Sequence, residues 1–304
     1  EDASSTAANR FDFGADFALE TKKTMLLIYD PTSARWGMIG GGSSSSSSSD
    51  PIGNKRLSLE SGVPVSTTDQ TAKTTVYWTD GTTNLSVAVP ATTSTPFDIF
   101  YSLSAGTLST VNWTNDTTRA TALAYSLGYL VKSGDIDKLY LGTGRTTTVS
   151  GQCEDSVTKR FIWSYYNRVE KKLAKTDTTD SWAYTTATWR SANNSTANRV
   201  EVVIGVNEVI VDIWLSVYTS QSAAWPRAVG IGLDTTSANS ATIKSKTNIV
   251  DPNLATSLYR DYPGAGYHYF QWVEYSVASG TTTWYGDNGE PTFTQSGMIG
   301  KISS

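Results

Sequence analysis

The sequence is poor in the residues on which most enzyme and metal sites depend. Its 304 residues include one cysteine, Cys153, and one histidine, His268. A single cysteine excludes an intrachain disulfide, and we interpret Cys153 as a small packing residue. His268 lies within GYHYFQW, inside a predicted strand, where a packed or hydrogen-bonded histidine is expected. A catalytic triad or a zinc site is therefore not indicated.

Charge and long hydrophobic runs are also scarce. Charged residues make up 17% of the chain and the formal net charge is −4, whereas roughly 25% is usual for soluble domains. The Lys and Arg residues are scattered and form no basic stripe, which argues against nucleic-acid binding. No apolar run approaches the roughly 20 residues of a membrane-spanning helix, so no membrane span is expected.

Motifs for cofactors and paired catalytic acids are missing as well. Gly142-Thr-Gly144 and Gly230-Ile-Gly232 lack the third glycine and the following helix of a nucleotide site. Asp287–Glu290 reads as a hairpin turn better than as a calcium loop. Other acids are available, but nothing in the sequence pairs two of them across space, as glycoside hydrolysis requires. We expect no cofactor, no metal and no enzymatic activity; a polysaccharide depolymerase is a remote alternative.

What the chain does contain is Thr, Ser, Gly and aromatic residues, including ten Trp. This composition favours strands, and the predicted fold class is mainly β. We expect four parts: an N-terminal β-hairpin unit, a serine-rich linker, a β-rich middle domain, and a short helix followed by a jelly-roll-like antiparallel sandwich. Their predicted limits are 1–42, 43–50, 51–151 and 152–304.

Strands are predicted from alternation of apolar and polar residues. In the first unit, Met25–Tyr29 and Arg35–Ile39 form a hairpin around Asp30-Pro31. In the middle domain, the sets are Leu57–Leu59, Val63–Val65, Thr75–Thr79 before an Asp80-Gly81 turn, Leu85–Val89 and Phe97–Tyr101. In the last part, they are Val200–Val206, Val209–Val217, Val229–Leu233, Tyr267–Val277, Thr281–Tyr285 and Pro291–Thr294. Apolar residues occupy even positions before Asn207-Glu208 and odd positions after it. A turn there would keep the apolar faces of both strands on one core.

One segment favours a helix instead. Apolar residues recur every fourth position between Glu154 and Leu173, beginning at Val157 and Phe161. A strand remains the alternative, because Phe161, Trp163 and Tyr165 also alternate.

Aromatic residues near predicted turns or strand ends are candidate contacts for sugar rings. The candidates are Trp225, Tyr259, Tyr262, Tyr267, Trp284 and Tyr285. The alternative is that they fill the core or an oligomer interface.

Several stretches resemble proteins of tailed-bacteriophage appendages. The N-terminal AANRF and FALETKKTMLLIYDPTSARW are similar to a short strand unit of tail-fibre segments. The resemblance continues through GNKRLSLESGVPVSTTDQTAKTTVYWT, YLGTGRTT, EDSVTKRFIWSYYNRV, DSWAYTTATWR and TTTWYGDNGEPTFTQSG, and so covers nearly the whole chain.

This resemblance implies a fibre or appendage component on the virion surface, in a family without catalytic residues to carry over. It implies a homotrimer that binds host-surface polysaccharide. The serine run Ser43–Ser49 suggests a tether, by which residues 1–42 attach to other virion proteins while residues 51–304 are displayed. A capsid decoration or head-fibre protein with a structural role is the alternative.

Overall fold

The computed structural model describes residues 11–12, 27–30, 35–38, 52–126 and 128–304. The chain divides into two compact units, Glu1–Gly53 and Asn54–Ser304. In the first unit, one sheet has the order β1 (Phe11–Asp12), β3 (Arg35–Met38), β2 (Leu27–Asp30). β2 and β3 are antiparallel, which confirms two paired strands in this region, although Met25, Leu26 and Ile39 of the predicted strands lie outside the described residues. The predicted serine-rich linker lies outside the described residues.

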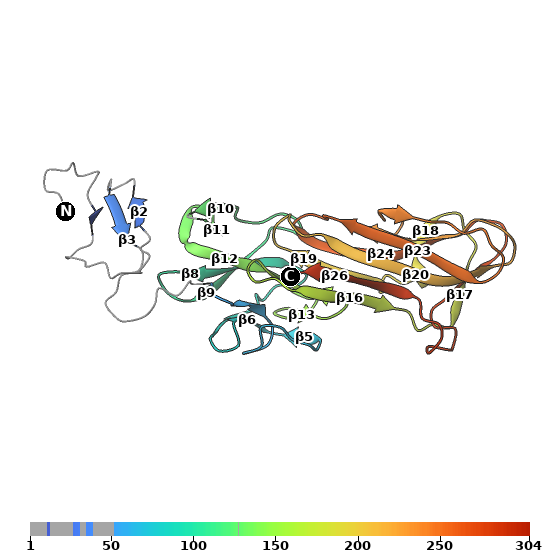
Figure 1. Ribbon diagram of the computed structural model, residues 1–304, viewed down its shortest axis with the longest axis horizontal. Helices are drawn as coiled ribbons and strands as arrows, with labels where there is room; N and C mark the ends of the chain where they lie inside the picture. Colours follow the sequence, from blue (N-terminus) through green and yellow to red (C-terminus); the bar gives the residue numbers. More distant parts are fainter. Residues whose placement is uncertain (1–10, 13–26, 31–34, 39–51, 127) are drawn as a thin grey trace, which may run out of the picture. The chain divides into compact units, whose positions relative to one another are not determined.

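The described residues of the second unit form four sheets, each named here by one of its strands (Figure 1). The β6 sheet has the order β4 (Arg56–Ser58), β6 (Thr75–Thr79), β7 (Asn84–Ala88). The β12 sheet has the order β10 (Leu123–Ser126), β11 (Tyr129–Lys132), β12 (Asp135–Arg145), β8 (Pro96–Ser102), β9 (Leu108–Asn112), with β15 (Ile162–Ser164) also paired to β12.

The other two sheets lie mainly in the C-terminal half. The β24 sheet has the order β18 (Trp189–Ser191), β24 (Gly266–Tyr275), β19 (Arg199–Ile204), β14 (Lys159–Arg160), β13 (Cys153–Asp155), β5 (Gln70–Lys73), with β21 (Ala228–Leu233) also paired to β24. The β20 sheet has the order β16 (Glu170–Thr176), β26 (Gly297–Ser303), β20 (Val211–Gln221), β23 (Asn253–Asp261), β22 (Ile243–Lys244). β25 (Thr282–Tyr285) pairs with both β20 and β17 (Ser181–Tyr184), and a short 3-10 turn covers Ala192–Asn194.

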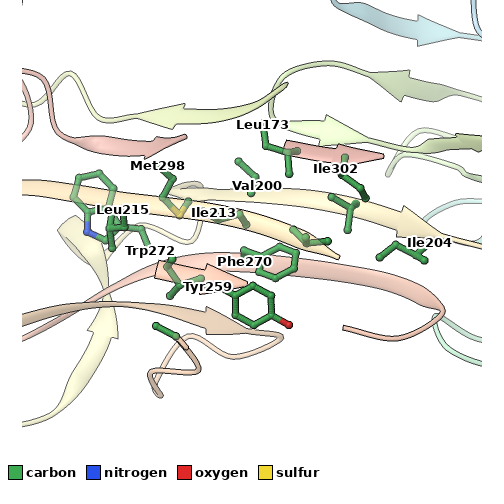
Figure 2. Close-up of a cluster of buried hydrophobic side chains, with 14 of the residues drawn as sticks. Leu173, Val200, Ile204, Ile213, Leu215, Tyr259, Phe270, Trp272, Met298 and Ile302 are labelled. Atoms are coloured by element: carbon green, nitrogen blue, oxygen red, sulfur yellow. The ribbon is translucent and has the colours of Figure 1, made fainter. Parts of the chain in front are cut away.

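The β24 and β20 sheets share the main hydrophobic core, which confirms a mainly-β sandwich. Phe270 and Trp272 of β24 are buried against Ile213, Leu215 and other side chains of the β20 sheet (Figure 2). The turn predicted at Asn207-Glu208 links β19 to β20, and both strands bury their apolar sides in this core. Side chains of the β12 sheet, including Tyr140, belong to the same cluster. One core therefore includes residues on both sides of position 151, where the predicted middle domain ends.

The prediction of a helix between Glu154 and Leu173 is wrong. The segment forms β13, β14, β15 and the start of β16. A repeat of four residues is also a multiple of the two-residue strand period, so the spacing could not separate helix from strand. Phe161, Ile162 and Trp163 are all buried, because this segment passes between packed sheets. The aromatic alternation was the better signal.

Two predicted strands are also absent, and each segment contains a proline, which cannot donate to a sheet. Residues 63–65 lie in bends, where the Ser58 hydroxyl donates to the Val63 carbonyl at 2.6 Å. Residues 291–294 form turns in which the amides of Phe293 and Thr294 both donate to the carbonyl of Glu290 at 2.9 Å. The strand at this end of the chain is β26, which the sequence pattern did not predict; the same holds for β16 and β23.

Candidate functional site

The long strand β20 turns half of its side chains into the core and half into solvent. Val211, Ile213, Leu215 and Val217 are fully buried, because successive side chains of a strand alternate between its faces. Trp214 points the other way and is 49% exposed. We call the solvent side of the β20 sheet the outer face.

The strand register places aliphatic side chains beside Trp214 on the outer face. Directly paired residues form one row across five strands: Ala174, Ile299, Trp214, Leu258 and Ile243. Neighbouring strands are about 4.8 Å apart, so the row spans roughly 19 Å. Ile299 and Ile243 are each more than half exposed. Ala174 and Leu258 are partly buried, so the row is an apolar strip in which Trp214, Ile299 and Ile243 are the exposed members.

A second row on the outer face is aromatic. Tyr218 of β20 is paired with Tyr285 of β25, and their ring centroids are 5.3 Å apart. The Tyr285 hydroxyl lies 3.0 Å from the Ser220 hydroxyl. Trp214 and Tyr218 are four residues apart on one strand, about 13 Å, and Ser216 lies between them. The outer face thus alternates aromatic rings with hydroxyl groups.

The other end of the outer face is charged. Asp212 of β20 is paired with Lys301 on one side and with Arg260 on the other. The Arg260 guanidinium lies 2.6 Å from the Asp212 carboxylate, and the Lys301 ammonium lies 2.6 Å from the Glu170 carboxylate.

This charged end opens into a cavity of about 600 Å³, which we call the charged pocket. Besides Asp212, Lys301, Arg260 and Glu170, its walls include Arg168, Glu208 and Tyr262. Arg168 and Glu208 form a further ion pair at 2.7 Å. Ile210, which is 43% exposed, also lines the pocket and makes part of its surface apolar.

A neighbouring cavity of about 500 Å³ shares Glu208 with the charged pocket. Tyr125, which is 72% exposed, stands at its wall, and its hydroxyl lies 3.2 Å from the Tyr165 hydroxyl. Arg119 also lines it, but its guanidinium is engaged by Asp98 at 2.8 Å and by the carbonyl of Gly205. This cavity has fewer charged side chains in its walls than the charged pocket.

The structure brings two of the sequence-predicted aromatic residues to these surfaces. Tyr285 lies on the outer face, and Tyr262, 54% exposed, lies at the charged pocket. Tyr259 is only 4% exposed and Trp284 is fully buried. Both belong to the hydrophobic core, so neither ring can stack on a sugar in this structure.

The remaining two candidates lie elsewhere. Trp225 is 46% exposed and sits beside Gly280, in loops beyond the end of β20. One face of the Tyr267 ring is covered by the Arg145 guanidinium, 3.6 Å from the ring centroid. The Tyr267 hydroxyl donates to Glu201. Neither residue joins the outer face.

Trp214 and Tyr218 were not among the sequence-predicted contacts, although the sequence carries a signal for them. In Val209–Val217 the odd positions are apolar, so the even positions are expected to face solvent. Large aromatic residues at solvent-facing positions of a strand are the pattern of a contact surface. The alternation along this one strand is therefore enough to single out both residues.

Three ionisable side chains, those of Glu274, Cys153 and His268, are buried in the interior and line neither cavity. Burial raises the pKa of Glu274 to about 7 against the opposing effect of hydrogen bonds from Trp182 and Arg190, each 2.7 Å long. Burial raises the pKa of the Cys153 thiol to about 12. The His268 ring is bonded to Asp234 at 2.8 Å and is 5% exposed. None of these groups faces a ligand-sized space.

The described ranges hold neither a metal cluster nor a membrane helix. They contain no group of three or more His, Cys, Asp or Glu side chains placed to hold a metal ion. In the same ranges, no helix has the length and hydropathy needed to cross a bilayer.

In comparisons with known proteins, no family model and no curated protein matches this chain.

Proposed function

We propose that this chain is a surface protein of a bacteriophage virion, a fibre or appendage component, and that its outer face binds host-surface glycan. The observation that carries the binding proposal is the exposed Trp214 in line with Tyr218 on one strand, with hydroxyl groups between them. The virion assignment rests on the sequence motifs that resemble phage appendage proteins.

Sugar rings present apolar C–H faces and hydroxyl edges. The outer face offers a match for both: rings and aliphatic side chains in two rows, and Ser, Thr and charged side chains beside them. Each sugar hydroxyl can donate and accept, as can the hydroxyls of Ser216 and Thr256, which are paired between the two rows. Exposed apolar strips of this kind mark binding surfaces.

The ionisable groups support binding rather than cleavage. Glycoside hydrolysis needs a carboxylic acid with a raised pKa and a second carboxylate on either side of the scissile bond. Glu274 has such a raised pKa but is completely buried. Asp212 and Glu170, at the edge of the outer face, are both engaged in ion pairs.

The test is binding of the purified protein to a glycan array and to host cells, with two matched variants. Trp214→Ala should weaken binding by about tenfold or more, or about 1.4 kcal/mol. Trp225→Ala removes an equally exposed indole away from the outer face and should leave binding unchanged. Absence of binding by the wild type to any glycan or host cell would refute the proposal.

A second candidate use of the same surface is self-association into the homotrimer implied by the resemblance. The aliphatic members of the apolar row, Ile299, Leu258 and Ile243, favour it, because such side chains are typical of interfaces between copies. Sedimentation of wild type and Ile299→Ser separates the two uses. A trimer that dissociates in the variant assigns the row to assembly; an unchanged state leaves it to the glycan.

A further inference from the structure

The charged pocket differs in character from the apolar rows of the outer face. Its charged wall residues are three cations, Arg168, Arg260 and Lys301, and three carboxylates. Every cation is paired with one of these carboxylates at 2.6 or 2.7 Å. The formal charges cancel, so the pocket combines strong local polarity with no net charge.

This arrangement does not favour a charged ligand. An anionic group would meet a cation and its paired carboxylate at almost the same distance, and the attraction and repulsion would largely cancel. To bind a cation directly, the anion would have to displace Asp212, Glu208 or Glu170 and leave that carboxylate without its partner. The same reasoning applies to a cationic ligand with the signs reversed.

Hydroxyl groups suit the same wall. A hydroxyl can accept a bond from an Arg or Lys N–H and donate one to a neighbouring carboxylate oxygen without breaking the ion pair. Such bonds involve an ionised partner on each side and are stronger than neutral ones. The half-exposed ring of Tyr262 and the exposed side chain of Ile210 complement the C–H face of a sugar ring.

The pocket is continuous with the proposed glycan surface. Asp212, Arg260 and Lys301 are outward-facing residues of the β20 sheet and also line the pocket. Trp214 follows Asp212 by two residues on the same face, a separation of about 7 Å. A saccharide chain lying along β20 would therefore reach the pocket within one or two sugar units.

We propose that the charged pocket binds an uncharged, hydroxyl-rich sugar unit of the glycan that lies on the outer face. The proposal rests on the glycan-binding function above and adds to it the class of sugar selected. The recognised chemistry is a neutral pyranose presenting several hydroxyls, and carboxylated, sulfated or phosphorylated units are disfavoured.

The test is a glycan array that carries neutral and acidic saccharides in parallel, followed by titration of the best binder at 50 mM and 500 mM NaCl. We expect neutral glycans to lead the ranking, and the affinity to change less than about twofold with salt, because no net charge is involved. A ranking led by acidic glycans, with affinity falling steeply in salt, would overturn this inference and leave the glycan-binding function standing. No signal from any glycan would remove the function itself, and the inference with it.

One matched pair of variants and one charge variant then locate the effect. Tyr262→Ala should weaken binding of the neutral glycan by about tenfold, whereas Tyr125→Ala, an exposed tyrosine of the neighbouring cavity, should not. Asp212→Asn leaves the pocket with one excess positive charge and should shift the ranking toward acidic glycans. If Trp214→Ala abolishes binding while Tyr262→Ala and Asp212→Asn change neither affinity nor ranking, the pocket takes no part and the inference is wrong.

Discussion

Glu274 allows a quantitative test of the packing between the β24 sheet and the β20 sheet. Its side chain is fully buried, with Trp182 and Arg190 as hydrogen-bond donors. Burial raises its pKa from the ordinary 4.5 to about 7. Between these two pH values the unfolded chain loses the proton while the native protein keeps it. The native state then binds more protons, so the free energy of unfolding falls as the pH rises.

The magnitude follows from the pKa. Each pKa unit corresponds to about 1.4 kcal/mol, so the contribution lost between pH 4.5 and pH 7 is about 3 kcal/mol. The stabilisation is complete below pH 4.5 and is lost as the pH rises through 7.

The assay is urea unfolding, followed by tryptophan fluorescence, of wild type and Glu274→Gln from pH 4.5 to 8. The difference between the two proteins isolates Glu274, because other titrating groups are common to both. Wild type should lose about 3 kcal/mol relative to the variant across this range. Glu170→Gln, at an exposed ion pair, should give a difference within about 1 kcal/mol. A pH-independent difference for Glu274→Gln would refute the reasoning.

Two further predictions concern the interior. A Cβ atom at Gly205 would lie 2.1 Å from the Tyr140 hydroxyl and 2.4 Å from the Trp163 ring. Gly205→Ala should therefore lower the free energy of unfolding, measured in urea, by about 1–3 kcal/mol. Unchanged stability would show that the two aromatic side chains can move aside. Cys153 is fully buried with a pKa raised to about 12, so a thiol reagent at pH 8 should label it only after unfolding; rapid labelling of the native protein would contradict this burial.

Alternation predicted much of the sandwich from sequence. It identified β19, β20, β21, β24 and β25, because each has one apolar face on a shared core. Between Glu154 and Leu173 a helix was predicted instead, because the spacing of four fits both periods and the short alternation of Phe161, Trp163 and Tyr165 is interrupted by the equally buried Ile162.

The pairing of distant segments could not be predicted in this way. β16 pairs with β26, more than a hundred residues later, and this pairing brings Glu170 to Lys301 at the charged pocket. Tyr259 was misjudged for a related reason. Its strand β23 was not predicted, so nothing indicated that Tyr259 faces the core.

The surface proposed to bind glycan could be only half predicted from the sequence. Tyr262 and Tyr285 were predicted because they lie near turns, and they do lie at the charged pocket and on the outer face. Trp214 was not predicted, because it lies in the middle of a strand and away from any turn. Its alignment with Ile299 and Leu258 depends on the sheet register, which alternation along a single strand does not contain.

The most direct test of the central claim is oxidation of exposed tryptophans by N-bromosuccinimide, read residue by residue by mass spectrometry, with and without a bound saccharide. Trp214 and Trp225 are 49% and 46% exposed, so both should react in the free protein. A saccharide on the outer face should protect Trp214 and leave Trp225 reactive. Protection of Trp225, or equal oxidation of Trp214 in the presence and absence of a saccharide shown to be bound, would contradict the account.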